Sequence, residues 1–431
     1  MTLGVALLVI VATHFVLKWL RRKLSAPPIC IHFDVNETIM LGDPAGGDSY
    51  EDSLHKILAK VAFVRPVAPG SSARGAGRWA DWTWHDGSPL DPLLRDPSAP
   101  PPPLLTEAFE DPPGCVRFYN VPELKRAFAK CFASKGSPGA IYAETLEGLR
   151  AQLRWPDGVP RDPVLCSEEG YHRFLPAFFE TLVELRRRRR PYSVVVRTFG
   201  TDLPHLLAAL DAFGRGRHPH HTGLRAPEFS IPPERTWRGR YDAKSGSFNL
   251  MRGARGDGFV GAFTSEAAML AELEGPLDRG GGAGGRLSAI QDDYGWWKGA
   301  GYSPGAGKPL WLTQEPGAAN RRFRHIFFDD NIHADPLDSI VAVRVRAKNA
   351  ASGGGGGGDD DDAAFSAFRP VSGRATVALQ GSVLRKVPTV RPVQQRGWFL
   401  EQIAKCEARC DELLARDARG EAGGFAAILS M

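Results

Sequence analysis

The stretch ICIHFDVNETI, residues 29–39, places an acidic group directly after a short apolar run. This run predicts a buried strand, because it is short and follows the helix-breaking pair Pro27-Pro28. Two further apolar runs end in a similar way, in VVVRTFGT (residues 194–201) and in HIFFDDN (residues 325–331). Polar groups after apolar strands are typical of an open, parallel, Rossmann-like sheet, whose ligands gather at the carboxyl ends of the strands. We therefore expect an α/β fold.

Three carboxylates are expected to meet at that edge of the sheet: Asp34, Asp329 and Asp330. Oxygen ligands of this kind suit Mg²⁺, which keeps the phosphate of a substrate in its coordination shell. A fixed ammonium group near them would neutralise both the nucleophile and the phosphate. Lys308 is the preferred candidate for that group, and Lys298 is the alternative, because no other lysine lies between residues 245 and 347.

The first two motifs resemble those of the haloacid-dehalogenase (HAD) superfamily of hydrolases. The first motif of that family is Asp-x-Asp-x-Thr after a strand, and it is similar to Asp34, Asn36 and Thr38 here. The second is a Thr or Ser that ends the next core strand, and Thr198 matches it.

The remaining two motifs follow in the order that the family shows. Its third motif is a lone lysine, which Lys308 matches. Its fourth is an acidic pair, which Asp329-Asp330 matches, while Asp335 offers the spaced variant. The resemblance covers the core strands, about half of the chain, and leaves the long insertions between them unexplained.

The resemblance implies a Mg²⁺-dependent phosphohydrolase that acts on a phosphorylated small molecule or a phosphoprotein. A carboxylate nucleophile would form an aspartyl-phosphate, which water then hydrolyses. The implied catalytic residues are Asp34, the nucleophile, Asn36 and Lys308. The implied contacts to the transferring phosphoryl group are Thr198, Phe199 and Gly200. The implied Mg²⁺ ligands are Asp34, Asn36 through its backbone carbonyl, Asp329 and Asp330.

Asn36 departs from the family pattern. The phosphatases of the family carry an aspartate there as general acid and base, and an asparagine cannot transfer a proton. The loss of such a catalyst typically costs about 10²–10⁴ in rate. Two alternatives therefore stay open: a catalytically reduced HAD-fold binding or scaffold protein at a membrane, and a dehalogenase-type hydrolase.

The N-terminus predicts a membrane anchor. Residues 3–17 are apolar apart from Thr13 and His14, and Trp19 and Leu20 extend the run past Lys18. A helix over residues 2–20 just spans a hydrocarbon core of about 30 Å. Arg21, Arg22 and Lys23 follow the apolar run, which predicts a single-pass membrane protein with the bulk of the chain in the cytosol. A cleaved or organelle-targeting leader is the alternative.

The composition limits the partners. The net charge of +5 is spread over 54 basic and 49 acidic side chains, whereas nucleic-acid binding usually shows as a clustered basic face, so we expect no nucleic-acid partner. Six cysteines in 431 residues are not a disulfide scaffold, and we expect reduced thiols. The 48 glycines and 34 prolines exceed the usual combined share of about 12% and indicate loose insertions in a folded core.

The predicted organisation has eight parts. They are a membrane anchor (1–24), the start of the HAD-like core (27–64), a partly disordered insertion or cap (65–165), core (166–213), a glycine-rich insertion (214–290), core (291–349), a Gly/Asp linker (350–364) and a C-terminal segment with a closing helix (365–431). Apolar periodicity predicts helices over residues 49–63, 169–189 and 398–418, and a fourth strand over residues 339–345.

Overall fold

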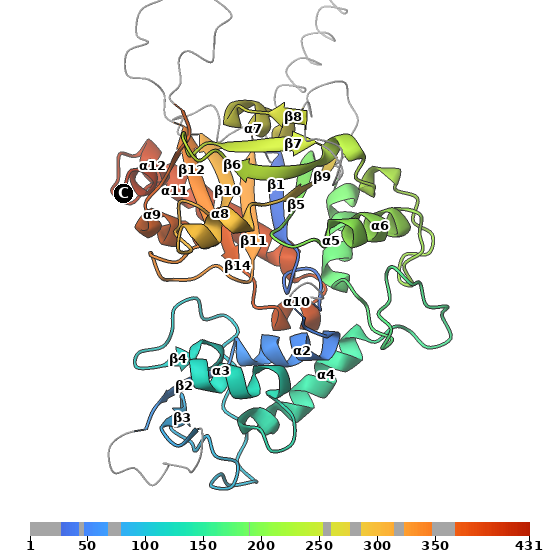
Figure 1. Ribbon diagram of the computed structural model, residues 1–431, viewed down its shortest axis with the longest axis vertical. Coiled ribbons are helices and arrows are strands. Elements are labelled where there is room, and N and C mark those ends of the chain that lie inside the picture. The colour runs from blue at the N-terminus through green and yellow to red at the C-terminus, as the bar shows by residue number, and fades with distance from the viewer. Residues whose placement is uncertain are drawn as a thin grey trace, which may run out of the picture.

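The computed structural model describes residues 27–42, 47–67, 79–188, 190–252, 260–275, 286–313, 323–346 and 367–431. In this part of the chain eight strands form the main sheet, in the order β14-β11-β1-β5-β9-β6-β7-β8 (Figure 1). Neighbours from β14 to β6 are parallel, and β7 and β8 are antiparallel. In chain order the strands are β1 (Ile29–Asp34), β5 (Tyr192–Thr198), β6 (Thr236–Tyr241), β7 (Phe248–Arg252), β8 (Val260–Phe263), β9 (Arg286–Gln291), β11 (Arg324–Asp329) and β14 (Leu384–Lys386). The mostly parallel α/β sheet expected from the sequence is confirmed.

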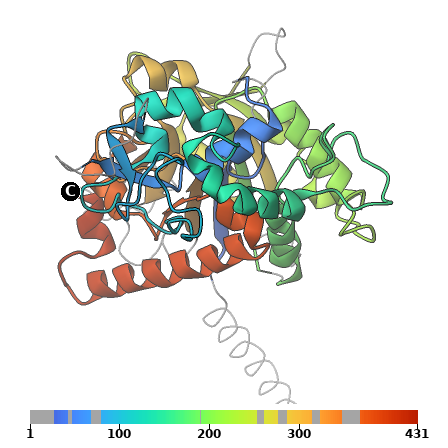
Figure 2. The ribbon, with the colours of Figure 1, turned by 90° about the horizontal axis from the view of Figure 1, so that it is seen from below.

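Helices cover one face of this sheet. Alternate residues of β1, Ile29, Ile31 and Phe33, are fully buried and share one apolar core with these helices. The covering helices are α5 (Pro176–Arg187), α6 (Leu203–Gly214) and α11 (Trp398–Ala418). The helix predicted over residues 398–418 is α11, which runs along one side of the molecule in Figure 2. The helix predicted over residues 169–189 begins later, at Pro176, because proline suits the first helical turn.

The opposite face packs against a second, three-stranded sheet. Its order is β10-β12-β13, and Trp311 of β10 shares a core with Cys30 of β1 and Val195 of β5. The predicted fourth strand is β12, which pairs with β10 and lies outside the main sheet. The elements of this layer are β10 (Lys308–Thr313), β12 (Val341–Arg346), β13 (Arg369–Pro370), α7 (Glu266–Glu274), α8 (Tyr294–Gly299), α9 (Gly373–Ala378) and α12 (Phe425–Leu429).

A separate cap lies beyond the carboxyl ends of the strands (Figure 1). Its apolar core gathers Leu54, Trp84, Phe118 and Leu149, and α10 of the C-terminal segment adds Val390. The tryptophan-containing insertion is therefore docked at Trp84, which is fully buried. The elements are α2 (Tyr50–Ala59), β2 (Phe63–Pro66), β3 (Trp82–Trp84), β4 (Val116–Arg117), α3 (Pro122–Phe128), α4 (Ala143–Leu153) and α10 (Val390–Gln394).

Two boundaries differ from the predicted organisation. The cap begins before residue 65, because the apolar face of α2 packs into the cap core rather than onto the main sheet. The glycine-rich segment 214–290 is more than an insertion, because it supplies β6, β7 and β8 and most of β9 to the main sheet. Strand β9 lies between β5 and β6 and is parallel to both.

The anchor predicted over residues 1–24 and the linker over residues 350–364 lie outside the described residues. Among the residues that the structure describes, no helix combines the length and apolarity needed to cross a bilayer.

Candidate active site

The ends of three neighbouring strands carry the predicted site. Asp34 ends β1, Asp329 ends β11 beside it, and Thr198 ends β5 on the other side of β1. All three side chains are buried. Because the three strands are parallel, their carboxyl ends meet at one edge, where ligands of α/β sheets bind. The structure thus brings these predicted residues together.

Lys308 joins them from the second sheet. Its Nζ donates to Asp34 Oδ1 and, over 2.8 Å, to Asp329 Oδ2. Burial disfavours the charged amine, but the carboxylates of Asp329 and Asp34 outweigh it and raise the pKa of Lys308. The alternative, Lys298, is exposed on α8. Lys308 is therefore the ammonium group of this site.

Asp34, Asp329 and Asp330 form a carboxylate cluster. One oxygen of each lies within 4.8 Å of the others. Burial raises the pKa of Asp34 well above its ordinary value, Lys308 opposes this, and Asp329 and Asp330 add to it. An oxygen-only donor set with excess negative charge fits Mg²⁺, and a divalent cation here would stabilise the ionised carboxylates.

A second lysine, from the cap, reaches the same cluster. Lys60 follows α2, and its Nζ lies 2.6 Å from Asp330 Oδ2 and also contacts Glu37. Burial alone would lower the pKa of Lys60, but Asp330 and Glu37 raise it well above the ordinary value. The backbone N–H of Asp330 in turn donates to Thr38 Oγ1 over 3.1 Å, which joins the first and fourth motifs. Lys60 was not predicted from the sequence.

Asn36 does not join the carboxylate cluster through its side chain. Its Nδ2 donates to Asp202 Oδ2 over 3.0 Å, and Thr198 Oγ1 lies 3.4 Å from the same oxygen. Asp202 stands at the N-terminus of α6 but makes no side-chain capping bond there. A buried carboxylate therefore adjoins the position where this chain has an asparagine. Asp202 was also missed, because four residues after Thr198 it reads as an ordinary helix cap.

Phe199 and Gly200 shape the wall beside Thr198. The Phe199 ring stacks on Trp297, with 5.1 Å between centroids, and its centroid lies 5.0 Å from Lys308 Nζ. The N–H of Gly200 donates to Thr198 Oγ1 over 2.9 Å. A Cβ on Gly200 would come within 2.4 Å of Asp202 Oδ2, so glycine leaves room for that carboxylate.

Asp335, the spaced alternative, is exposed and accepts from the N–H of Leu337 over 2.8 Å. It serves a turn, and the adjacent pair Asp329-Asp330 is the acidic motif that the structure brings to the site.

A buried ion pair next to the site holds its residues in place. Arg197 Nε donates to Asp292 Oδ2 over 3.0 Å, and its Nη1 donates to the carbonyl of Pro309, next to Lys308, over 2.9 Å. The N–H of Asp292 donates to the carbonyl of Thr198 over 2.7 Å. These bonds fix the end of β5 relative to Lys308. No local sequence pattern indicates the pair of Arg197 and Asp292, since the two residues are 95 positions apart.

A pocket of about 780 Å³ opens between the cap and the core beside Asp330. Its volume is typical of small-molecule sites. Basic side chains from both parts line it together with an equal number of acidic ones: Lys60, Arg117, Lys125 and Lys386, and Asp111, Asp330, Asp335 and Asp338. Arg117 is paired with Asp111, and Lys60 with Asp330. Burial and the nearby Arg117 lower the pKa of Lys386 to about 7. The walls of the pocket are therefore mixed in charge.

No protein-family model, curated protein or solved structure matches this chain. The function is therefore inferred from the residues and their geometry.

Proposed function

We propose that the protein is a Mg²⁺-dependent phosphohydrolase of the HAD type, with Asp34 as nucleophile. The observation that carries the proposal is the Lys308 ammonium held between Asp34 and Asp329 at the carboxyl edge of a parallel sheet. The three carboxylates of the cluster lie within 4.8 Å of one another and face only two ammonium groups, Lys60 and Lys308. Surplus negative charge at one buried point favours a cation site.

The residues of the site have the following roles in the reaction. A carboxylate oxygen of Asp34 bonds to phosphorus while the bond from phosphorus to the leaving oxygen breaks, and that oxygen takes the electron pair. Water then attacks the phosphorus, and the bond between phosphorus and Asp34 breaks to release phosphate. Thr198 Oγ1 and the amides that follow it bind the phosphoryl oxygens, and Lys308 neutralises charge on Asp34 and the phosphoryl group. Bound at Asp34, Asp329 and Asp330, Mg²⁺ would supply further charge neutralisation.

Asp202 is our candidate for the proton transfer that Asn36 cannot perform. Its Oδ2 lies 3.0 Å from the Asn36 amide, and so beside the place of the family's acid–base aspartate. The leaving oxygen needs a proton as the first bond breaks, and the attacking water must lose one in the second step. A carboxyl group supported by Asn36 and Thr198 can serve both steps.

The substrate we propose is a phosphorylated small molecule. The pocket beside Asp330 has the volume for such a molecule, and its mixed basic and acidic lining suits a polar one. A phosphoprotein remains an outcome of the test rather than our first choice, because this pocket is of small-molecule size.

The test is phosphate release by the full chain with Mg²⁺, from p-nitrophenyl phosphate and a panel of phosphorylated metabolites and phosphopeptides. We expect turnover that needs Mg²⁺ and falls by at least about 10³-fold in Asp34→Asn. Asp202→Asn should cost about 10²–10⁴-fold. Asp157→Asn is the matched control and should keep full activity, because Asp157 is exposed and lies outside both the cluster and the pocket.

Three results would count against the proposal. Unchanged turnover in Asp34→Asn would exclude it as the nucleophile. Release of halide from haloacids, without phosphate release, would favour the dehalogenase alternative. If the folded chain neither turns over any phosphate ester nor binds beryllofluoride with Mg²⁺, the scaffold alternative holds.

A further inference from the structure

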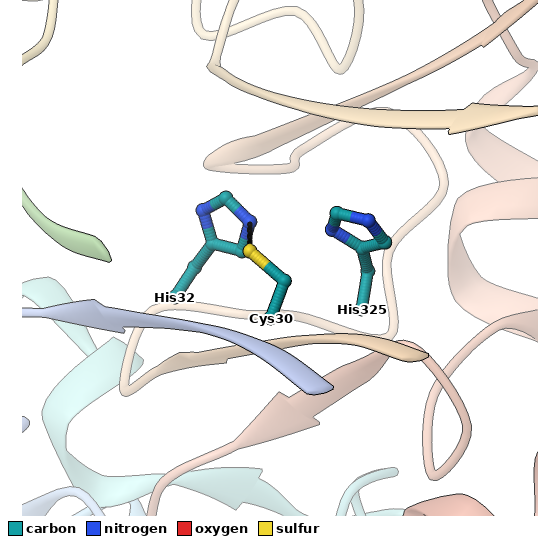
Figure 3. A group of neighbouring side chains, drawn as sticks. All are labelled: Cys30, His32 and His325. Carbon is teal, nitrogen blue, oxygen red and sulfur yellow. Dashed lines mark hydrogen bonds between the residues drawn. The ribbon is translucent and has the colours of Figure 1, made fainter. Parts of the chain in front are cut away.

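A second group of ligand-type side chains lies on the same two strands as the carboxylate cluster. Cys30 and His32 of β1 and His325 of β11 form what we call the Cys–His cluster. Cys30 and His325 are direct partners in the parallel ladder, and His32 shares the face of Cys30 because it is two residues further along. All three side chains are buried, and they point to the same side of the sheet and toward one another (Figure 3).

The spacing of the three side chains suits one tetrahedral ion. One ligand atom of each lies within 4.8 Å of the others, and His32 Nε2 is 3.6 Å from Cys30 Sγ. Zinc bonds of about 2.3 Å to sulfur and 2.0–2.1 Å to nitrogen place neighbouring ligands about 3.4–3.6 Å apart. The His32–Cys30 pair is therefore already at ligand spacing, whereas His325, within 4.8 Å of both, would have to move closer.

The hydrogen bonding of His325 leaves one ring nitrogen available to a ligand. Its Nε2 is paired with Glu274 Oε1 at 2.9 Å, whereas its buried Nδ1 has no hydrogen-bond partner. A carboxylate on one ring nitrogen, with the other nitrogen left for the metal, is the usual arrangement of metal-binding histidines. Burial of an unpaired polar atom is otherwise unfavourable.

The ring of His32 is held in place by its neighbours. Its ring stacks on Phe327 with 5.3 Å between centroids, which fixes its plane. Arg197 Nη1 donates to His32 Nδ1 over 3.4 Å, so zinc at Nε2 would move the ring proton to Nδ1 and displace this long hydrogen bond. Arg197 would keep its bidentate pair with Asp292 and its bond to the carbonyl of Pro309.

We propose that Cys30, His32 and His325 bind a zinc ion, with Glu274 orienting His325. Thiolate and imidazole ligands favour zinc over Mg²⁺, which prefers oxygen. The three protein ligands leave the fourth tetrahedral position to a water molecule or another small ligand.

The consequence of the zinc site is structural. The ion would join β1 to β11 near the beginnings of the strands that end in Asp34 and Asp329. Through Glu274 it would also attach α7 to them. It is independent of the proposed hydrolysis, because none of its ligands belongs to the carboxylate cluster.

The test measures metal in the full chain, with excess Mg²⁺ present to occupy the carboxylates. Zinc per chain is determined by mass spectrometry after gel filtration, and the spectrum is recorded after cobalt replaces zinc. We expect one zinc per chain and a thiolate-to-cobalt charge-transfer band, which carboxylates cannot produce. Both should be lost in Cys30→Ser and kept in Cys410→Ser, because Cys410 is buried on α11 outside the cluster.

A second variant covers the risk that Cys30→Ser does not fold. Glu274 is partly exposed at the end of α7, so Glu274→Gln should fold, yet bind zinc about 10- to 100-fold more weakly. An unchanged zinc affinity in Glu274→Gln would overturn the role of Glu274. Wild-type chain without the cobalt band, or with no more zinc than Cys30→Ser, would overturn the site and leave only a buried polar cluster.

Discussion

The carboxylate cluster and the Cys–His cluster occupy the same face of β1 yet differ in every property that decides which ion they bind. The first lies at the strand ends, consists of oxygen atoms and is held by two lysines. The second lies earlier on the strands, consists of sulfur and nitrogen, and has a carboxylate behind one ring. Because side chains alternate along a strand, hard and soft ligands lie on one face of β1, a few residues apart.

The largest effect expected at the carboxylate cluster comes from Lys308→Met. Removal of one partner of a buried ion pair typically costs about 3–5 kcal/mol, because the remaining charges are left uncompensated. Asp34 and Asp329 would both lose their ammonium partner. We expect this loss in the free energy of unfolding measured with urea. Added Mg²⁺ should restore part of the stability, whereas zinc bound at the Cys–His cluster should not. Lys298→Met is the matched control and should change the free energy of unfolding by less than about 0.5 kcal/mol.

Equal stability of Lys308→Met and Lys298→Met would show that the buried lysine does not hold the carboxylates. Recovery with zinc, at a concentration that fills only the Cys–His cluster, would show that the two clusters are not independent.

A stacked pair of histidines, His172 and His218, sharpens the contrast, because neither ring is paired with sulfur or with a carboxylate. His172 stacks on His218 with 5.0 Å between centroids, and neither nitrogen of its ring has a hydrogen-bond partner. Burial, His220 and Arg396 lower the pKa of His172 to about 3. Its stabilising effect is thus complete above the unfolded pKa of about 6.5 and is lost as the pH falls toward 3.

The expected loss at His172 is about 2–3 kcal/mol between pH 7 and pH 4.5, from about 1.4 kcal/mol per pH unit. In His172→Phe the apolar ring keeps the packing and removes this part of the acid sensitivity. Urea unfolding at the two pH values measures the difference, and exposed His205→Phe should leave it unchanged. The same acid loss in wild type and His172→Phe would contradict the assignment. Zinc should not bind this group.

Asn36→Asp would add a fourth carboxylate to the acidic end of β1. Two carboxylates about 3 Å apart cannot both ionise freely, so one of the pair with Asp202 acquires a raised pKa. A carboxyl with a raised pKa binds a proton longer in the folded state, so the variant loses stability relative to wild type as the pH rises from about 4 to 8. A pKa that is higher by one pH unit in the folded state lowers the stability at high pH by about 1.4 kcal/mol.

Denaturation of Asn36→Asp across this pH range checks the sign. The double variant with Asp202→Asn should lose the pH slope, because the second carboxylate is gone. A slope that survives in the double variant would mean that the new carboxylate is coupled to Asp34 instead.

The smallest effect is expected from Gly200→Ala. The added Cβ would displace the end of the Asp202 side chain and so break its bonds from Asn36 and Thr198, at a cost of about 1 kcal/mol. Gly148→Ala is the matched control of opposite sign, because Gly148 has open space on helix α4 and alanine should stabilise it by about 0.5–1 kcal/mol. Thermal unfolding of both variants measures the contrast, and a stabilised Gly200→Ala would contradict the close approach.

Local patterns were enough to find what lies along single strands. The apolar runs that became β1, β5 and β11 carried Asp34, Thr198 and the Asp329-Asp330 pair, and parallel pairing then brought them together. Strand β9 was missed because Leu287, Ser288 and Ala289 are small or mixed in polarity, although their neighbours bury them completely or nearly so. Its place between β5 and β6 is set by the sheet, not by its own sequence.

The supporting residues of the site could not be predicted, for a different reason. Lys60 and Asp330 are 270 positions apart, and Asn36 and Asp202 are 166 apart. Such pairs are created only when distant segments fold together, and no local periodicity records them. The same holds for His325 and Cys30, which the ladder brings opposite each other.

The position of Lys60 has a consequence for the control of access. This ammonium belongs to the cap, yet it lies 2.6 Å from an oxygen of the core carboxylate Asp330. A cation that takes this oxygen must displace Lys60, and so weakens one of the bonds that hold the cap in place. By reciprocity, a shift of the cap away from the core raises the affinity of Asp330 for that cation. Lys60, which holds the cap closed, and the cation would then compete for a single oxygen atom of Asp330.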